Sequence, residues 1–210
     1  MVRGVVGRNQ YDRLRTRLAC VRLLRILKRH MKYRDMMRET KLSPTVLNRY
    51  CLGKIIPHQS RAEELYAMIL KNIRRYVPFK PETNDIELLN VYADLALEKL
   101  IGLRVTKVLT SEFDNVPFAT LVADRVSKPI IIASTRMRDM ENICVPIQFS
   151  LNRYEPLFVP KKAIKRSDSV LIVSNLTHVR QTLMRICLKA RADITGYLVI
   201  EENGVFFHVL

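Results

Sequence analysis

Six polar residues follow a short apolar run in the second half of the chain, and their side chains could hold a phosphate. The run Val170–Val173 predicts a buried strand, and polar groups placed directly after such a strand lie where α/β sheets bind ligands. Hydroxyl, amide and guanidinium groups all suit an anionic ligand there. The candidate ligand-binding residues are Ser174, Asn175, Thr177, His178, Arg180 and Thr182.

A second group of residues, near residue 43, has the types and spacing of a DNA-reading helix. Ser43 can cap a helix that begins at Pro44, and Gly53 can end it. A short helix is expected just before, over residues 33–40. Two short helices joined by a tight turn can present the second helix to the major groove of DNA.

This pattern resembles the lambda-repressor-like helix-turn-helix family over residues 33–70, although Lys41 stands where a glycine often makes the turn. The resemblance implies that these residues face DNA: Ser43, Pro44, Thr45, Asn48 and Arg49. Asn can pair with adenine and Arg with guanine. Four further residues suit phosphate contacts: Arg34, Arg38, Lys41 and Lys54. The alternative is a helical bundle whose polar residues are only solvated.

The positive charge of the chain is concentrated in its first 80 residues. These contain 20 Lys and Arg against 5 Asp and Glu, whereas residues 81–210 contain 16 against 15. A small basic part joined to a near-neutral part is typical of proteins that bind a polyanion. The composition changes near residue 79, so we expect an all-α DNA-binding domain over residues 1–78 and a second domain over 79–210.

Residues 79–210 predict an α/β domain, because apolar strands alternate with helical patterns. We expect a mostly parallel sheet with helices on its faces. Strands are expected at 105–110, 129–134, 169–173, 195–201 and 205–209, and helices at 84–101, 116–126 and 180–190. Residues 155–160 are expected to be extended.

The order of these elements resembles the type I phosphoribosyltransferase fold over most of residues 85–205. The stretches that carry the likeness are VTKVLTSEFDNVPFATLVADRVSKPIIIASTR and LFVPKKAIKRSDSVLIV. The nearest likeness is to orotate phosphoribosyltransferase-like proteins, including archaeal regulators that join a helix-turn-helix to this domain. The resemblance implies dimerisation and a site for a nucleotide or phosphoribosyl-type effector.

In that family, two acidic residues after the diagnostic strand hold the ribose hydroxyls of phosphoribosyl pyrophosphate, and a glycine-rich loop holds the 5′-phosphate. Ser174 and Asn175 stand at the acidic positions here, and Arg180 and Gln181 at glycine positions. The preceding loop, residues 111–116, offers two carboxylates but no cation. The resemblance therefore implies no catalytic residue, and we expect a domain that is not an enzyme.

The expected function is a sequence-specific, DNA-binding transcription regulator that forms a homodimer. Its phosphoribosyltransferase-like domain would serve dimerisation, effector sensing or both, with double-stranded DNA as the partner. Two alternatives stay open: a divergent phosphoribosyltransferase of nucleotide salvage, and a protein that binds RNA or DNA without sequence preference. The residues also leave two alternatives for the ligand pocket of this family: in this chain it is either open or filled by side chains.

Other classes of function find no support in the sequence. The four cysteines form no CxxC pair and the four histidines show no ligand spacing, so we expect neither a metal nor another cofactor. No apolar run approaches the roughly 20 residues that span a bilayer. The first ten residues lack the apolar middle of a signal peptide. We therefore expect a cytoplasmic protein without a membrane partner.

Overall fold

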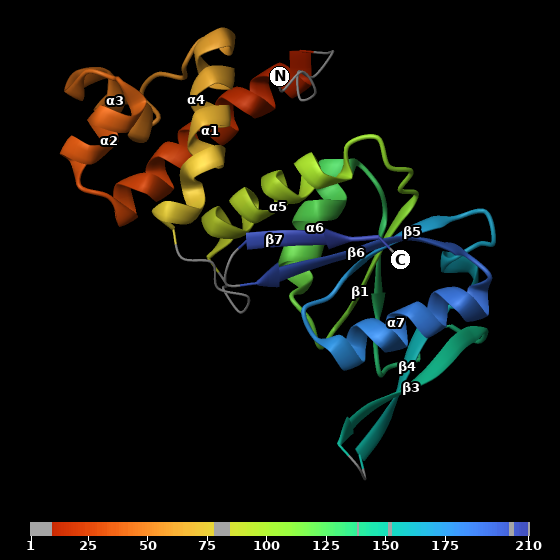
Figure 1. Cartoon of the computed structure of the whole chain (residues 1–210). Helices are drawn as coiled ribbons and strands as arrows, with labels where there is room; N and C mark the ends of the chain where they lie inside the picture. Colours follow the sequence, from red (N-terminus) through yellow and green to blue (C-terminus); the bar gives the residue numbers. More distant parts are fainter. Residues whose placement is uncertain (1–9, 78–84, 138, 151–152, 202–203, 210) are drawn as a thin grey trace. The chain divides into compact units, whose positions relative to one another are not determined.

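The computed structural model describes residues 10–77, 85–137, 139–150, 153–201 and 204–209. The chain divides into two compact units, Met1–Phe79 and Lys80–Leu210 (Figure 1). Among the helices in the described ranges, none has both the length and the apolarity needed to cross a membrane.

The first unit consists of helices in its described part. They are α1 (Gln10–His30), α2 (Tyr33–Thr40), α3 (Pro44–Cys51), α4 (Gln59–Asn72) and a 3₁₀ turn, Ile73–Arg75. The long helix α1 packs against α2, α3 and α4 (Figure 1). Its apolar face repeats at helical spacing, and Leu24 of α1, Met36 of α2 and Leu47 of α3 are fully buried.

The second unit is built on a five-stranded sheet with the strand order β2-β1-β5-β6-β7. The strands are β1 (Lys107–Ser111), β2 (Ile130–Ala133), β5 (Ser169–Val173), β6 (Asp193–Glu201) and β7 (Gly204–His208). The first four are parallel to one another, and β7 is antiparallel to β6. The predicted mostly parallel sheet is therefore confirmed.

Helices cover both faces of this sheet, as the sequence predicts. The helices are α5 (Ile86–Leu100), α6 (Val116–Val126) and α7 (Thr177–Ala190). Helices α5 and α6 pack together on one face, and α7 lies on the other (Figure 1). A 3₁₀ turn, Lys161–Ala163, precedes β5.

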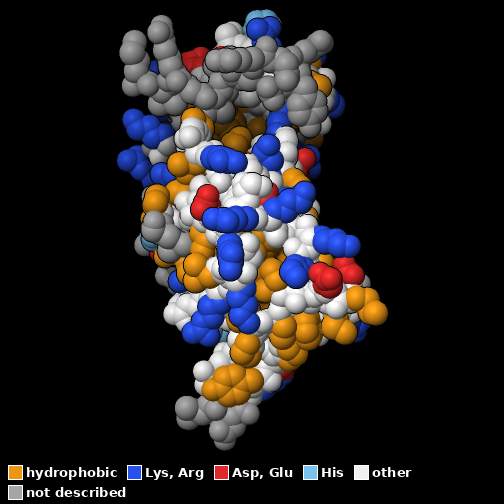
Figure 2. Space-filling model, turned by 90° about the vertical axis from the view of Figure 1, so that its right-hand side faces the viewer, with side chains coloured by type: hydrophobic (Ala, Val, Ile, Leu, Met, Phe, Trp, Pro, Cys, Tyr) orange, Lys and Arg blue, Asp and Glu red, His pale blue; other side chains and the backbone are white. Residues whose placement is uncertain are grey.

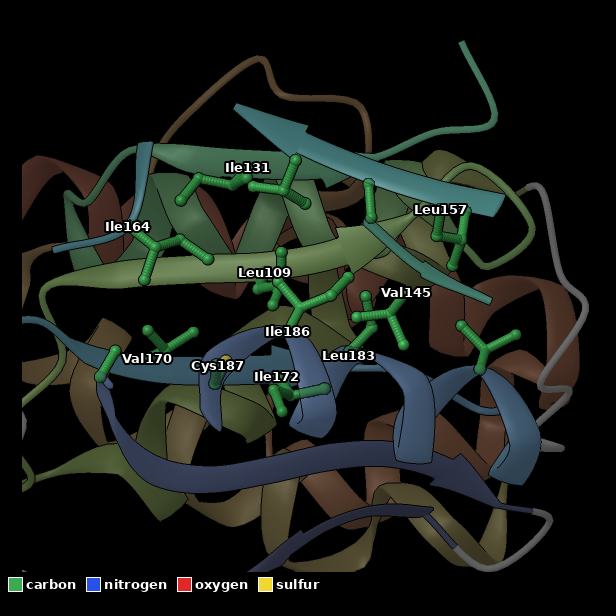
Figure 3. Packing of buried hydrophobic residues seen from close by; sticks show 14 of the residues in the cluster. Leu109, Ile131, Val145, Leu157, Ile164, Val170, Ile172, Leu183, Ile186 and Cys187 are labelled. Atoms are coloured by element: carbon green, nitrogen blue, oxygen red, sulfur yellow. The ribbon is translucent and has the colours of Figure 1, made fainter. Parts of the chain in front are cut away.

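A separate antiparallel hairpin, β3 (Asn142–Ser150) with β4 (Arg153–Pro160), lies on the same side of the sheet as α7 (Figure 3). Only residues 155–160 were expected to be extended, so β3 was missed in the sequence. The alternation of apolar and polar residues that indicates a strand is not visible in β3, because Cys144 and Pro146, on its outward side, are also apolar. The inward Val145 and Ile147 pack with Leu183 of α7 in the main core cluster.

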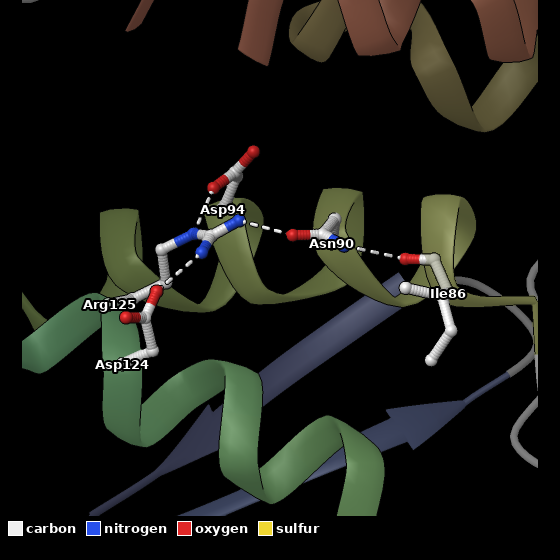
Figure 4. A network of polar contacts seen from close by, with 5 residues as sticks. All are labelled: Ile86, Asn90, Asp94, Asp124 and Arg125. Carbon is white, nitrogen blue, oxygen red and sulfur yellow. Dashed lines mark hydrogen bonds and ion pairs between the residues drawn. The ribbon is translucent and has the colours of Figure 1, made fainter. Parts of the chain in front are cut away.

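Helices α5 and α6 are joined by a buried polar network around Arg125 (Figure 4). Its guanidinium donates to Asp94 Oδ1 at 2.6 Å, to Asn90 Oδ1 at 2.7 Å and to Asp124 Oδ2 at 2.9 Å. Burial by itself would lower the pKa of Arg125, but the charges and hydrogen bonds of Asp94 and Asp124 outweigh it and raise that pKa. The network therefore holds a charged guanidinium between the two helices.

Candidate functional site

A carboxylate lies at the carboxyl end of β5, although it comes from a different loop. Asp114, in the loop after β1, accepts hydrogen bonds from the backbone N–H of Asn175 at 3.0 Å and from the hydroxyl of Ser174. Because β1 and β5 are parallel neighbours, their carboxyl ends meet at the same edge of the sheet. The sequence places Asp114 in the short loop between β1 and α6, but its contact with Ser174 and Asn175 depends on β1 and β5 being neighbours.

Three of the six candidate ligand-binding side chains, those of Ser174, Asn175 and Thr182, bond to the loop after β1, to β6 and within α7. Ser174 is fully buried against Asp114, and Asn175 Oδ1 accepts from the backbone N–H of Ile200 at 2.8 Å. Thr182 is 3% exposed and donates to the carbonyl of His178 at 3.0 Å. These side chains fix the loop and the helix that follows it.

Helix α7 begins at Thr177, three residues earlier than the predicted start at Arg180. The sequence offers no capping residue there, and the residue before the helix, Leu176, makes no side-chain capping bond. The backbone N–H groups of residues 177–179 find no acceptor among the residues that the structure describes. Such a helix start carries partial positive charge and attracts anions.

Arg180 is held beside this helix start. Its guanidinium donates to the carbonyl of Ser174 at 3.4 Å and to the hydroxyl of Thr177 at 3.3 Å. It also lies over the ring of Tyr197, 4.3 Å from the ring centre. Tyr197 of β6 is a site residue that the sequence reasoning missed, and the adjacency of β5 and β6 is the feature that brings it here.

The neighbouring part of the same sheet edge carries a second carboxylate and a second guanidinium. Glu112, after β1, accepts from the backbone N–H and the hydroxyl of Thr135, at 2.6 and 2.7 Å. Arg136 lies three residues after the end of β2 and is exposed. The edge of the sheet formed by β2, β1 and β5 thus presents both signs of charge.

His178 lies on a different side of α7 from Arg180. Its ring meets the edge of Phe149 in β3, with 5.6 Å between the ring centres. The structure therefore does not gather the six candidate residues into one pocket. Arg180 and Thr177 stay near the end of β5, and His178 turns toward the hairpin.

Cysteines and histidines do not gather into a metal site in the described ranges, where no cluster of three or more His, Cys, Asp or Glu side chains could hold an ion. Burial raises the pKa of the thiols of Cys20 and Cys187 to about 12, so both stay protonated. We assign no residue to a metal.

In the first unit, a three-residue turn joins α2 to α3. Lys41 ends α2 with a left-handed φ of 53°, the conformation for which a glycine is usual. Ser43 accepts from the backbone N–H of Val46 at 3.5 Å, and Pro44 begins α3. The hydroxyl of Tyr33 donates to the carbonyl of Pro44 at 2.7 Å, which fixes the first turn of α2 against that of α3.

The two sides of α3 differ in burial. Leu47 and Cys51 are buried, and the thiol of Cys51 contacts the carbonyl of Leu24 in α1. The candidate DNA-facing residues are all exposed: Ser43, Pro44, Thr45, Asn48 and Arg49. The candidate phosphate contacts are exposed as well: Arg34, Arg38, Lys41 and Lys54. Arg38 pairs with Asp35 at 3.2 Å.

No protein-family model and no curated protein matches the chain. Several solved structures are similar to it, and adenine phosphoribosyltransferases are among them. The enzyme from Thermoanaerobacter pseudethanolicus has a TM-score of 0.49 and 14% identity, over 54% of this chain and 67% of that one. The enzyme from Rhodothermus marinus has a TM-score of 0.48 and 20% identity, over 62% and 84%.

A third similar structure is the Trypanosoma brucei enzyme, solved in complex with AMP, pyrophosphate and ribose-5-phosphate. It has a TM-score of 0.44 and 9% identity over 53% of this chain, and the match spans 50% of that enzyme's length.

The prediction that the chain is not an enzyme is contradicted by these comparisons, because the solved structures similar to it are enzymes. That prediction depended on the loss of carboxylates at Ser174 and Asn175. The carboxylate of Asp114 was recognised in the loop of residues 111–116 but was not placed at this site, and it reaches the same end of β5 from the loop after β1. The chain is similar to adenine phosphoribosyltransferases in its α/β fold, at low sequence identity.

Proposed function

We propose that the second unit binds a phosphoribosyl ligand at the carboxyl end of β5, as a divergent phosphoribosyltransferase. The observation that carries this proposal is the carboxylate of Asp114, held beside the uncapped start of α7. Asp114 accepts from the N–H groups of Asn115 and Asn175 and from the hydroxyl of Ser174. An ionised carboxylate has about four acceptor sites, which leaves one for a ribose hydroxyl.

The phosphate of such a ligand would lie against the first turn of α7. The backbone N–H groups of residues 177–179 supply donors, and helix starts bind phosphates in many proteins. Arg180 adds a guanidinium that can form paired hydrogen bonds with a phosphate. An arginine side chain would thereby supply part of the binding that a glycine-rich loop supplies through its backbone.

The reaction of this class moves a ribose phosphate from pyrophosphate to a nucleobase. The bond between the ribose C1 and pyrophosphate breaks and pyrophosphate leaves with the bonding electrons, while the ring nitrogen bonds to C1 and releases its proton to the pyrophosphate or to water. Arg136 is an exposed cation that comes after β2 on this edge, and its positive charge would stabilise the departing pyrophosphate anion.

Asp114→Asn tests the ligand site. Titration of the intact protein with phosphoribosyl pyrophosphate and Mg²⁺ should show saturable binding, and the variant should bind roughly 10-fold more weakly, since it removes a charged acceptor. Asp193→Asn is the matched control, because Asp193 is an exposed carboxylate at the amino end of β6. Equal affinities of the parent and Asp114→Asn would contradict the proposal.

A second function is favoured by the exposed side of α3 in the strongly basic first unit. We infer that α3 reads the major groove of duplex DNA as the second helix of a helix-turn-helix. In α3, Asn48 and Arg49 are exposed whereas Leu47 is buried. The polar side of α3 is therefore available for contacts with bases. A homodimer would place two such helices about 34 Å apart, at successive turns of a palindromic site.

Asn48→Ala and Arg49→Ala test the reading of DNA. Each should lower the affinity for a duplex selected from a random pool by roughly 5- to 150-fold, with little effect on unselected duplexes. Lys71→Ala removes an exposed charge from α4 as the control and should weaken all duplexes alike. If all three variants lose affinity by the same factor for every duplex, the binding is not sequence-specific and α3 is not the helix that reads DNA.

A further inference from the structure

A pocket of about 340 Å³ opens between α7 and the β3–β4 hairpin. Its α7 wall is formed by His178, Gln181 and Arg185, which recur at helical spacing on one side of the helix. Its other wall is formed by Gln148, Phe149 and Tyr154 of the hairpin. Asp114 and Arg180 do not line the pocket, which lies beside the site at the end of β5 and shares His178 and Thr182 of α7 with the candidate residues.

The charges of this pocket favour an anion. No Asp or Glu lines it, whereas Arg185 is exposed and has no hydrogen-bond or ion-pair partner in the described part of the chain. The nearby Arg153 is paired with Glu155 at 2.6 Å. The guanidinium of Arg185 is therefore available for a phosphate, which it can bind through two parallel hydrogen bonds.

The hairpin wall of the pocket is aromatic. Phe149 meets Phe113 edge-on at 4.8 Å between ring centres, and His178 edge-on at 5.6 Å, so its ring is held in place. Tyr154 is 59% exposed, which leaves its ring open for stacking. On the face shown in Figure 2, hydrophobic side chains lie beside Lys and Arg side chains.

We propose that this pocket binds a nucleoside monophosphate. A planar base would stack on Tyr154, and the phosphate would lie against Arg185. Gln148 and Gln181 supply neutral donors and acceptors between the two ends. The pocket volume falls within the range of small-molecule sites, and aromatic walls with a few polar groups are typical of them. This site does not depend on the proposed transfer reaction.

The test is calorimetric titration of the intact protein with AMP, adenosine and ribose 5-phosphate. AMP should bind saturably and more tightly than either fragment. Arg185→Ala should weaken AMP binding roughly 10-fold or more, because a charged hydrogen-bonding group is lost. Tyr154→Ala should weaken AMP but leave ribose 5-phosphate nearly unchanged. Arg166→Ala, an exposed arginine before β5, is the control and should change AMP affinity less than twofold.

Three results would overturn the proposal. One is the absence of saturable AMP binding to the parent protein, and another is an equal loss in Arg185→Ala and Arg166→Ala, which would indicate unspecific attraction to a basic chain. The third is a loss of AMP affinity in Arg180→Ala but not in Arg185→Ala, which would place AMP at the end of β5. Failure of the phosphoribosyl site is seen separately, in the response of phosphoribosyl pyrophosphate binding to Asp114→Asn.

Discussion

Replacing Asp94 by alanine is expected to lower the free energy of unfolding by about 3–5 kcal/mol, because it leaves the guanidinium of Arg125 buried without its main counter-charge. The two side chains are 9% and 5% exposed, and their contact distance is 2.6 Å. Asn90 still accepts from Arg125, but a neutral amide cannot replace a carboxylate (Figure 4). Urea unfolding followed by circular dichroism measures the loss.

The matched control is Asp124→Ala, which removes a different carboxylate from the same guanidinium. Asp124 is 60% exposed, so water screens its charge and can replace it. An exposed pair of this kind contributes up to about 1 kcal/mol. If the two variants were equally stable, the buried pair would not be what joins α5 to α6.

Replacing Gly196 by alanine is expected to destabilise the sheet by roughly 2–5 kcal/mol, from backbone strain and overpacking together. Gly196 has a φ of 148°, and a β-bulge interrupts the pairing of β5 with β6 at this point. An added Cβ would lie 2.4 Å from the carbonyl oxygen of His208 and 2.6 Å from the ring of Phe207. The backbone of β7 would have to move away from β6.

Gly102→Ala separates strain from crowding. Gly102 also has a positive φ, 83°, but an added Cβ would meet no atom within 4 Å. The Gly102→Ala variant should therefore lose only roughly 1–2 kcal/mol of unfolding free energy, which is the cost of a side chain on a backbone with positive φ. Thermal unfolding of both variants gives the comparison, and equal losses would show that the contact with β7 is not what requires a glycine at 196.

The main elements of the second unit could be predicted because their signals are local. A buried strand such as Val170–Val173 is a continuous apolar run, and α5 has an Asp85 cap before an amphipathic pattern. Strand β3 could not be predicted in this way, since Cys144 and Pro146 hide the alternation of inward and outward residues. The start of α7 was placed too late because Leu176 is not a capping residue.

The site at the end of β5 was only half predictable from the sequence. The polar types after the strand could be recognised, but not that Ser174 and Asn175 would bond inward to Asp114 and β6. That depends on which strands are neighbours, a long-range property. The same limitation hid Tyr197 beneath Arg180 and led to the mistaken expectation of no enzyme.

The most direct test of the phosphoribosyl site is a crystal structure of the intact protein grown with phosphoribosyl pyrophosphate and Mg²⁺. We expect the 5′-phosphate within hydrogen-bond distance of the backbone N–H groups at the start of α7 and of Arg180, with a ribose hydroxyl on Asp114. An ordered, empty β5 end at saturating ligand, or a ligand seated only beside Arg185, would contradict the account.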